Sequence, residues 1–408
     1  MGRPEIRFKG YTDEWEQRKL GDWGNFYYGR SCPKWSVTED ATIPCIRYGE
    51  LYTKFGAKID RVYSYTNMPP ENLRFSKGTE VLIPRVGEDP MDYNHCTWLS
   101  MQDVAIGEMI SVFNTDNNPL FTATMFNATL QNEFAMRVEG GSVTNLYFEK
   151  LKNIDVSFPS IPEQEKIAAY FENFDHLITL HQRKCDEVKS LKKYMLQKMF
   201  PQNEQKVPEI RFKGFTEAWE QRKLGDIASS FEYGLNAAAK EYDGENKYIR
   251  ITDIDDNTHK FLTDNLTSPD IDLTGADNYK LTEGDILFAR TGASVGKTYI
   301  YRNSDGLVYY AGFLIRARIK EEYDAEFVFQ NTLTDRYNKY IAVTSQRSGQ
   351  PGVNAQEYAE FEINVPKKEE QTKIGTYFRN IDHLITLHQQ KCEELKKIKK
   401  FMLQKMFV

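Results

Sequence analysis

The sequence has few cysteines and no long apolar run. Its five cysteines are Cys32, Cys45, Cys96, Cys185 and Cys392, and no two of them form a CxxC pair. Such sparse thiols are typical of a reduced, cytoplasmic protein, and they exclude a zinc ribbon or a disulfide scaffold. A membrane helix needs about 20 predominantly apolar residues in succession, and we expect no membrane span because no such run occurs. The first residues are charged without an apolar stretch behind them, so we also expect no signal peptide.

The composition is that of a globular chain. It has 408 residues, of which 40% are hydrophobic and 27% are charged, and this length is enough for two or three domains of ordinary size. The formal net charge is −6. A negative total weakly disfavours a chain that binds nucleic acid by itself, because such binding depends on neutralising phosphates.

Two segments of the chain occur twice. Residues 208–226 repeat residues 4–22 with 16 identities in 19 positions, and residues 370–407 repeat residues 163–200 with 27 identities in 38 positions. The inserts between these copies, 23–158 and 227–365, barely resemble each other. Two near-identical frames therefore hold two different inserts, which indicates one shared role for the frame and two separate roles for the inserts.

The longer repeated segment is expected to form a coiled-coil helix. Its apolar and small residues recur at steps of three and four, from Ile167 to Met199 in the first copy and from Ile374 to Met406 in the second. Ser160 and Glu163 have the spacing of a capping box at the start of the first copy. Each helix would be about 57 Å long, and an amphipathic helix of that length needs a partner.

The order of the segments predicts how these two helices pair. The first helix carries the chain from the first insert towards the second, and the second helix follows the second insert. Equivalent packing of the two copies would make the helices antiparallel. It would also bring the two chain ends together, which gives a circular arrangement with an internal pseudo-two-fold repeat.

The inserts are predicted to contain both strands and helices. Residues 80–85 and 285–290 are rich in strand-forming residues, and residues 313–319 alternate like a strand. Residues 326–340 have a helical pattern. The predicted fold class is therefore mixed α/β, with two globular α/β domains separated by two long antiparallel coiled-coil helices.

Taken together, these features resemble the specificity subunit of type I restriction–modification enzymes. The resemblance covers the whole chain. It rests on the opening motif around Trp15 and its copy around Trp219, on the Pro-x-x-x-Glu-Gln helix entries at 159–164 and 366–371, on the DHLITLHQ core of both helices, and on TEGDILFARTG at 282–292 with its counterpart GTEVLIPRVG at 78–87.

The resemblance implies a division of the chain into four parts. Residues 1–158 would be the first target-recognition domain, with the opening segment 4–22, and residues 159–200 would be the first spacer helix. Residues 201–365 would be the second target-recognition domain, with the repeated segment 208–226, and residues 366–408 would be the second spacer helix.

The resemblance also implies a function. The chain would be a non-catalytic subunit in which each domain reads one half of a bipartite, asymmetric site in double-stranded DNA. The helices would set the separation of the domains and dock two methyltransferase (modification) subunits, and restriction–translocase subunits would join them. The chain itself would need no cofactor, because S-adenosylmethionine and ATP would bind to the partner subunits.

The charge of the inserts does not by itself favour DNA binding. The first insert has 12 basic and 16 acidic residues, and the second has 14 basic and 22 acidic residues. We therefore expect the basic groups to gather on one face, or the partner subunits to supply phosphate contacts.

Loops of both inserts offer the side chains that read base edges, which are mainly Arg, Lys, Asn and Gln. The candidates are Arg30, Lys34, Arg47, Arg85, Asn94 and His95 in the first insert, and Asn236, Arg250, Arg290, Ser294, Lys297, Gln346, Arg347 and Gln350 in the second. The alternative for each residue is an ordinary solvated position in a loop. Arg85, Arg290 and Arg347 are the candidates that we favour most.

A second apolar stripe lies beside the predicted seam of the helices. It consists of Tyr170, Leu177 and Leu180, with Tyr377, Leu384 and Leu387 in the copy. The stripe would pack against the chain's own domains or would dock helices of a partner subunit. The sequence leaves both possibilities open.

Two further motifs offer other chemistry. Residues 291–298 resemble a phosphate-binding P-loop, but only three residues separate Gly292 from Gly296, and a strand is expected to follow. The pairs His181 with Cys185 and His388 with Cys392 have a spacing that can bind metal. The same spacing suits seam residues that fix the register, and we expect no metal site. We also find no catalytic constellation in the sequence.

Two other classes of function remain open at this stage. A structural coiled-coil adaptor would bind proteins with its two variable domains and would show no sequence-selective DNA binding. A self-sufficient nucleotide-dependent enzyme would depend on the imperfect P-loop.

Overall fold

Two long helices each contribute to two compact units. The computed structural model describes residues 2–202, 205–346 and 349–408. The first unit comprises the residues up to Gln182 and those from Gln390 onward, and the second unit comprises Arg183–Gln389. The long helices are α6 (Ile161–Met199) and α11 (Lys368–Met406), which confirm the two predicted helices. Neither they nor the other described helices are both long and apolar enough to cross a membrane.

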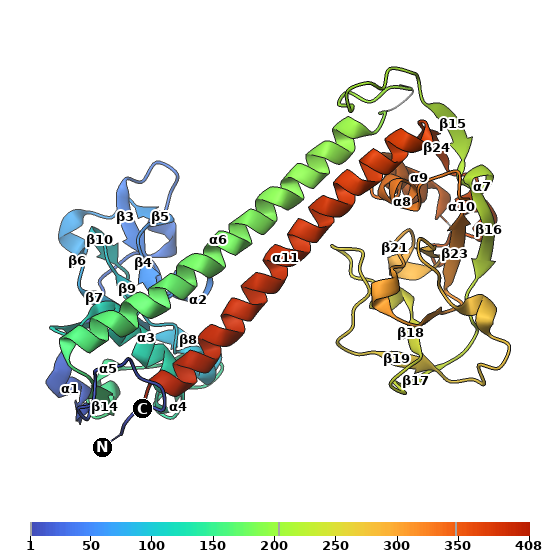
Figure 1. The fold of residues 1–408 in the computed structure, drawn as a ribbon. Helices are drawn as coiled ribbons and strands as arrows, with labels where there is room; N and C mark the ends of the chain where they lie inside the picture. The colour runs from blue at the N-terminus through green and yellow to red at the C-terminus, as the bar shows by residue number, and fades with distance from the viewer. Residues whose placement is uncertain (1, 203–204, 347–348) are drawn as a thin grey trace. The chain divides into compact units, whose positions relative to one another are not determined.

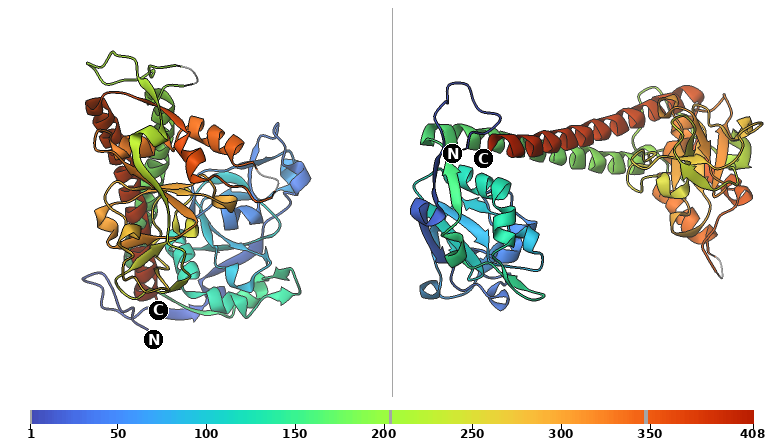
Figure 2. Two further views of the ribbon diagram at one scale, coloured as in Figure 1. Left: turned by 90° about the vertical axis from the view of Figure 1, so that its right-hand side faces the viewer. Right: turned by 90° about the horizontal axis from the view of Figure 1, so that it is seen from below.

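Within each unit the two long helices lie side by side and antiparallel (Figures 1 and 2). As the residue number rises along α6, the number of the facing residue on α11 falls. The contacts with this order are Asp175 with Lys399 and Ile178 with Cys392 in the first unit, and Cys185 with Ile385 and Lys192 with Asp382 in the second. The predicted antiparallel pairing is therefore confirmed.

The two ends of the chain meet in the first unit (Figures 1 and 2). Ile6 donates its N–H to the carbonyl of Lys405 at 2.9 Å, and the Lys405 ammonium binds the Glu5 carboxylate at 2.6 Å. The equivalent contacts of the second unit are those of Lys198 with Ile210 and Glu209. The predicted meeting of the chain ends is thus confirmed. The contacts between the chain ends match those that form where the chain leaves α6 and enters the second copy of the opening segment.

The first unit contains two main sheets. The larger has the order β2 (Gly24–Tyr28), β11 (Ile110–Thr115), β7 (Glu80–Pro84), β9 (Thr97–Leu99), β4 (Lys58–Ile59). The other has the order β5 (Ser64–Thr66), β3 (Ile43–Ile46), β10 (Gln102–Ile106), β6 (Phe75–Lys77), and a small sheet joins β12 (Glu139–Gly140), β13 (Thr144–Asn145) and β8 (Val86–Gly87). The short helices are α1 (Leu20–Trp23), α2 (Tyr48–Thr53), α3 (Pro119–Thr129), α4 (Gln131–Ala135) and α5 (Phe148–Leu151).

The second unit has one main sheet and two strand pairs. The sheet has the order β16 (Ala228–Tyr233), β23 (Leu314–Ile319), β20 (Ile286–Ala289), β21 (Thr298–Ile300). The pairs are β17 (Ala239–Glu241) with β19 (Thr267–Pro269), and β18 (Lys247–Ile249) with β22 (Val308–Tyr310). The helices are α7 (Leu224–Ile227), α8 (Ala325–Asn331), α9 (Asp335–Thr344) and α10 (Ala355–Ala359).

The repeated opening segment forms the entry to each long helix. In the first unit β1 (Glu16–Lys19) pairs with β14 (Asp155–Phe158), and in the second β15 (Glu220–Lys223) pairs with β24 (Glu362–Val365). The preceding tryptophan is buried in both copies, with Trp15 2% exposed and Trp219 1% exposed. Burial of a side chain this large explains why the tryptophan is the same in both copies, because the pocket around it leaves little room for change.

The strand predictions at 80–85, 285–290 and 313–319 are confirmed by β7, β20 and β23. The helix predicted over 326–340 is instead two helices, α8 and α9, with a break at 332–334. The hydroxyl of Thr334 accepts the backbone N–H of Tyr337 at 3.4 Å and so begins α9. A threonine in this position competes with the helix backbone for hydrogen bonds, which favours a new start over a continuous helix.

Candidate nucleic-acid interface

An arginine stacks on a tyrosine at the edge of the main sheet of the second unit. Arg290 directly follows β20, and its guanidinium lies 4.9 Å from the centre of the Tyr233 ring. The backbone N–H of Arg290 donates to the carbonyl of Phe313 at 3.0 Å, which continues the pairing of β20 with β23. The negative face of the ring attracts the cation and gives the guanidinium a preferred place.

A glycine makes this arrangement possible. Gly234 follows Tyr233, and a Cβ atom added to it would lie 2.2 Å from the carbonyl oxygen of Ala311. Only a residue without a side chain fits at this distance. The backbone that presents Tyr233 therefore packs directly on the turn that precedes β23.

These residues line an open cleft of about 560 Å³. Three of the predicted DNA readers, Asn236, Arg250 and Arg290, lie together in its wall. Two aromatic side chains, Tyr233 (43% exposed) and Phe313 (59% exposed), line the same cleft. The fold thus gathers donors and aromatic surface from separate parts of the sequence.

The two arginines of the cleft differ in how their donors are used. Arg250 binds both carboxylate oxygens of Asp253, each at 2.8 Å, and this hydrogen bonding raises the pKa of Arg250. The guanidinium of Arg290 makes no hydrogen bond or ion pair within the part of the chain that the structure describes. Arg290 therefore keeps its full set of donors for a ligand, whereas Arg250 has two of them engaged.

Lys297 and Ser294 lie outside the cleft and serve the fold. The ammonium of Lys297 donates to the carbonyl of Ile254 at 3.0 Å and pairs with Asp256 at 2.6 Å. Ser294 is half-buried in a short 3-10 helix over residues 292–294. Lys297, the lysine of the P-loop-like stretch, thus holds a neighbouring loop, and the strand β21 follows it.

The remaining candidates of the second insert belong to the loop after α9. Gln346 and Gln350 are exposed, and Gln346 donates to the carbonyl of Ala342 at 3.3 Å. Arg347 lies outside the described residues. Neither glutamine lines the cleft that holds Arg290.

The first unit contains a second arginine stacked on a tyrosine. The guanidinium of Arg85 lies 4.9 Å from the centre of the Tyr28 ring. The backbone N–H of Arg85 donates to the carbonyl of Met109 at 3.2 Å, and its Nη2 contacts the sulfur of Met109 at 3.0 Å. Gly29 follows Tyr28, and a Cβ atom on it would lie 2.0 Å from the carbonyl oxygen of Gly107. Arg85 therefore occupies in the first unit the place that Arg290 occupies in the second.

Three exposed side chains follow β2 in the first unit. Arg30 and Lys34 are both exposed, as the prediction requires for contact with DNA. Trp35 directly follows Lys34 and is 72% exposed. The ring of Trp35 is therefore accessible beside two exposed cations of the same loop.

The other candidates of the first insert are engaged within the unit. Arg47 is half-buried and precedes α2, where its backbone N–H donates to Glu50 at 2.8 Å. Asn94 donates to the carbonyl of Asn127 at 3.1 Å. The ring of His95 lies 5.3 Å from the ring of Tyr52. The side chains of Asn94 and His95 are therefore engaged within the unit, whereas the contact of Arg47 is made by its backbone.

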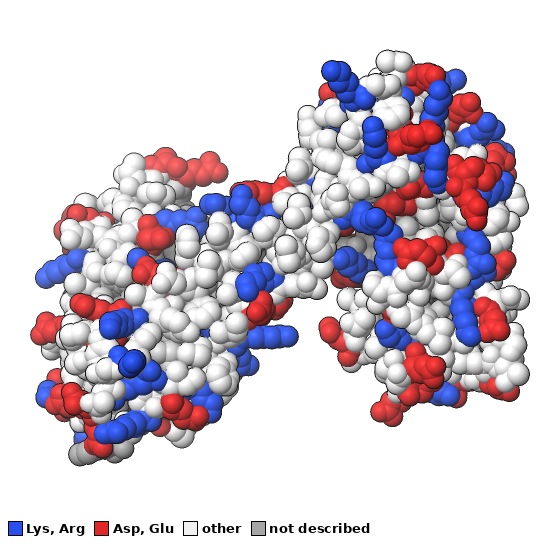
Figure 3. Space-filling view, viewed as in Figure 1, with Lys and Arg blue, Asp and Glu red and all other residues white. Residues whose placement is uncertain are grey.

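Charged side chains of both signs are interspersed on the visible face of each unit (Figure 3). The view shows Lys and Arg beside Asp and Glu on both inserts, without one broad basic patch on that face. Cations of both units also form ion pairs, for example Lys223 with Glu360 and Lys150 with Glu139. The face in view is therefore not one on which the basic groups gather.

The apolar stripe of the long helices has two parts. The ring of Tyr170 packs edge-on against Phe8, with 5.7 Å between centroids, and the ring of Tyr377 packs against Phe212 at 6.2 Å. The chain's own opening segments therefore contact both tyrosines. The leucines are more open, with Leu177 40%, Leu384 44% and Leu387 50% exposed and Leu180 half-buried. Leu191 and Ile398, which belong to the predicted seam pattern, are exposed as well, and so are Tyr194 and Phe401.

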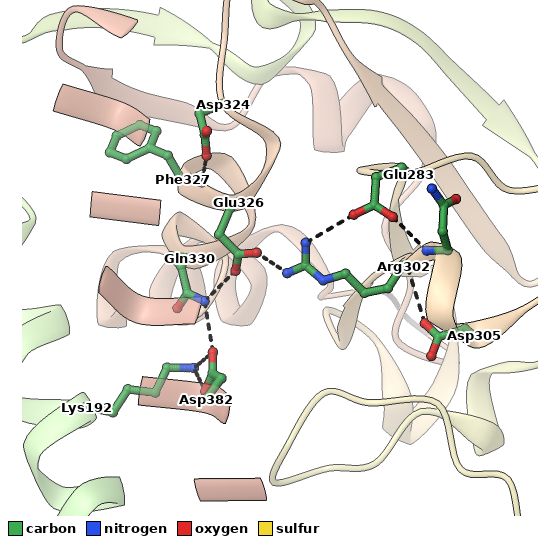
Figure 4. Close-up of polar contacts among 10 residues, drawn as sticks. Lys192, Glu283, Arg302, Asp305, Asp324, Glu326, Phe327, Gln330 and Asp382 are labelled. Atoms are coloured by element: carbon green, nitrogen blue, oxygen red, sulfur yellow. Dashed lines mark hydrogen bonds and ion pairs between the residues drawn. The ribbon is translucent and has the colours of Figure 1, made fainter. Parts of the chain in front are cut away.

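A chain of polar side chains joins the second insert to both long helices within the second unit (Figure 4). Lys192 of α6 binds the two carboxylate oxygens of Asp382 of α11 at 2.7 and 2.9 Å. Gln330 of α8 donates to Asp382 at 3.1 Å and to Glu326 at 3.0 Å. Glu326 in turn binds Arg302. The insert is therefore held on the two helices by hydrogen bonds and ion pairs, which are directional interactions.

The first unit joins its insert to the helices differently. In the first unit the side chain of Gln164 accepts the backbone N–H of Asn118, which precedes α3. In the second unit Gln371 accepts the backbone N–H of Asp324, which precedes α8, in the same way. Helices α3 and α8 are therefore equivalent. By this alignment Leu120 and Thr124 stand where Glu326 and Gln330 stand in the second unit. The hydroxyl of Thr124 donates to the carbonyl of Leu120 in its own helix, at 2.7 Å.

The seam cysteines contact backbone carbonyls. The sulfur of Cys185 lies 4.0 Å from the carbonyl oxygen of Ile385, and that of Cys392 lies 4.0 Å from the carbonyl oxygen of Ile178. Among the described residues, no group of three or more His, Cys, Asp or Glu side chains is placed to hold a metal ion.

Comparison with known proteins gives one consistent relationship. A family model described as the type I restriction modification DNA specificity domain matches residues 12–190 and 216–397. The chain is 23% identical over 286 residues to the type I restriction enzyme MjaVIII specificity subunit of Methanocaldococcus jannaschii, and the match covers 65% of this chain and 64% of that relative.

Solved structures share the fold. The chain is similar to a crystal structure of the S subunit of a type I restriction–modification system from M. genitalium, with a TM-score of 0.68, 14% identity and coverage of 100% of this chain and 99% of that one. A second structure, from work on complex assembly and conformational transition of the type I restriction–modification system, has a TM-score of 0.52 and 15% identity and covers 97% of this chain and 98% of that one.

Proposed function

The chain belongs to the type I restriction–modification DNA specificity family, and from this premise we propose that it selects the DNA sequence on which a type I complex acts. Each insert reads one half of a bipartite, asymmetric site in double-stranded DNA. The observation that carries the proposal is the doubled reading geometry, in which Arg85 lies over Tyr28 and Arg290 lies over Tyr233, both at 4.9 Å.

Stacked arginines suit the reading of bases. An arginine can donate two parallel hydrogen bonds to the O6 and N7 atoms of guanine in the major groove. The ring beneath it limits the directions that the guanidinium can take, which lowers the entropy lost on binding. Because the surroundings of Arg85 and Arg290 differ, two such arginines in one chain would read two different half-sites.

The helices would serve as the spacer and as the docking surface for partners. Paired antiparallel helices are stiff, so they would hold the half-sites at a fixed separation. The open leucines Leu177, Leu180, Leu384 and Leu387 would receive the helices of two methyltransferase (modification) subunits, and Tyr170 and Tyr377 would support them from the covered part of the stripe. Restriction–translocase subunits would then join the complex.

The partner subunits would supply what the chain lacks. Mixed surface charge and a net charge of −6 predict weak binding to DNA by the chain alone, since affinity for DNA grows with the phosphates neutralised. Methylation would use S-adenosylmethionine, and translocation would use ATP, on the partner subunits. The chain would be non-catalytic and would work in the cytoplasm, where its DNA substrate is.

A second candidate function is a coiled-coil adaptor whose inserts bind proteins. The exposed Trp35 and Phe313 would suit it, because aromatic anchors are common in protein interfaces. The donors of Arg290, which are unpaired among the described residues, lie beside an open cleft and favour DNA over this alternative.

Methylation mapping tests the proposal. The chain is produced with the modification subunit of its own system in a host without other adenine methylation, and the methylated bases of the host genome are located by long-read sequencing. We expect one bipartite motif with two defined blocks and a gap of constant length. Assembly with partners in the absence of any sequence-selective methylation or binding would contradict the proposal and favour the adaptor.

A further inference from the structure

Phe313 is the most exposed aromatic residue of the second unit's cleft. It directly precedes β23 and is 59% exposed, whereas all residues of β23 are buried or half-buried. A phenyl ring in water loses the burial that stabilises other aromatic residues of the fold. The ring is therefore open to a ligand that enters the cleft beside Arg290.

Arg290 is the direct neighbour of Phe313 across the sheet. The register of β20 with β23 pairs Ala289 with Leu314, and the hydrogen bond from Arg290 to the carbonyl of Phe313 extends that ladder by one step. Residues opposite each other on such a ladder have Cβ atoms about 4.5–5.5 Å apart. Successive base pairs are about 3.4 Å apart along DNA, so two such neighbours have the spacing to meet adjacent base pairs.

The two side chains offer complementary chemistry for base edges. Unpaired guanidinium donors match the O6 and N7 acceptors of guanine, and an apolar ring matches the 5-methyl group of thymine. We propose that Arg290 and Phe313 read neighbouring base pairs of the second half-site, Arg290 through guanine and Phe313 through the thymine methyl group. This inference rests on the function proposed above and adds the identity of two bases to it.

The first unit has a different residue in the same place. There Met109 faces Arg85 across the sheet, and its sulfur lies 3.0 Å from the Arg85 guanidinium. Met109 is half-buried and presents no open ring to a ligand. The two reading positions thus keep the arginine and change its neighbour, which would give the two half-sites different bases beside a shared guanine.

Removal of a single methyl group from the DNA tests the pairing. The wild-type complex with its modification subunit is bound to duplexes that contain its mapped motif, and each thymine of the second half-site is replaced in turn by uracil, which lacks only the 5-methyl group. At one position, next to a guanine, we expect about fourfold weaker binding, as one buried methyl group predicts.

The matched variant Phe313→Ala decides whether Phe313 is the partner of that methyl group. Its complex should bind thymine and uracil duplexes equally well, and its methylation motif should relax at that position while the neighbouring guanine is kept. Phe313→Leu should restore part of the preference for thymine. Leu262→Ala is the control, because Leu262 is 44% exposed and does not line the cleft; it should behave like the wild type.

The other outcomes overturn the inference in distinguishable ways. A complex whose second half-site has no thymine beside a guanine, or whose Phe313→Ala variant keeps the full sensitivity to uracil, would show that Phe313 does not read this methyl group. In both cases the mapped bipartite motif would leave the proposed function standing. A wild-type complex without any sequence preference would overturn the proposed function itself, and this inference with it.

Discussion

Arg7 and Glu163 form a two-pronged ion pair at the point where α6 begins. The Nε and Nη2 atoms of Arg7 donate to the two carboxylate oxygens at 2.6 and 2.8 Å, and the Glu163 side chain has no exposed surface. Arg211 and Glu370 repeat the pair at 2.6 and 2.7 Å in the first turn of α11. The opening segment of each frame is thus joined to the helix that follows its insert, about 160 residues later in the chain.

Loss of one partner of this pair should destabilise the first unit. We expect Arg7→Leu to lower the free energy of unfolding by about 3–5 kcal/mol, because it leaves the buried Glu163 carboxylate without a counter-charge. The double variant Arg7→Leu with Glu163→Leu should recover most of the loss. Chemical denaturation measures both effects.

The control for this prediction is an exposed ion pair in the same segment. Arg18 and Glu16 are 49% and 55% exposed, so Arg18→Leu should change the free energy of unfolding by no more than about 1 kcal/mol. Equal effects of Arg7→Leu and Arg18→Leu would show that the buried pair has no special role.

The polar chain of Figure 4 should hold the second insert in one position on the helices. We expect Gln330→Leu to cost about 1–3 kcal/mol, because the buried Glu326 and the half-buried Asp382 each lose a hydrogen bond. The variant complex should still methylate both half-sites but should accept more than one gap length. Thr124→Val in the first unit is the control, because its hydroxyl bonds only within α3, and a wild-type gap in the Gln330→Leu complex would argue against a positioning role.

A half-buried histidine of the second unit, His259, should make its stability depend on pH. The Nδ1–H of His259 donates to the carbonyl of Thr298 at 2.9 Å, with Lys192, Lys297 and Asp382 nearby. Burial lowers the pKa of His259 below its usual 6.5. As the pH falls through about 6.5, the unfolded chain therefore gains a proton that the folded chain does not, and the stability decreases until the folded pKa is reached.

The variant His259→Asn isolates this effect. His259 has a φ of 54°, a conformation that asparagine tolerates. Denaturation of the wild type and the variant at pH 7.5 and pH 5.5 should show a smaller loss of stability for the variant. Identical losses would mean that His259 does not titrate differently on folding.

Periodicity in the sequence was sufficient to predict the long helices and the main strands. The steps of three and four between Ile167 and Met199 repeat over many turns, and strand patterns such as residues 80–85 are short but flanked by glycine. The break before α9 was missed because one threonine, Thr334, outweighs a helical pattern on both sides of it. Repeats also predicted that the chain ends meet, since copies of one segment pack in one way.

Long-range contacts explain what could not be predicted. Arg85 and Arg290 were chosen from similar local sequence, but their stacking on Tyr28 and Tyr233 joins strands that are far apart in the chain. The bond between Gln330 and Asp382 has no local signal for the same reason. The contacts of Lys297 depend on a loop that precedes it by about 40 residues, so its structural role has no local signal either. The exposure of Phe313 likewise depends on all the segments that line the cleft. The sequence Gly312-Phe313 at the start of a predicted strand is a weak signal that could have indicated the exposed ring.

The stacked arginines should act on separate half-sites. Arg85→Lys and Arg290→Lys keep the charge but lose the planar pair of donors. We expect each variant to relax one G·C position, with a discrimination loss of about 1–3 kcal/mol, in the first half-site for Arg85 and in the second for Arg290. Methylation motifs of the two variant complexes give the answer, and relaxation of both halves by either substitution would mean that the half-sites are not read independently.

An exchange of the whole second insert tests the central claim most directly. Residues 227–365 are replaced by the equivalent region of a relative with a different methylation motif, and the frame segments are left unchanged. If each insert reads one half-site, the motif of the hybrid complex will keep the first block and the gap and will take its second block from the relative. A hybrid that methylates normally but changes in both blocks, or in neither, would contradict the account.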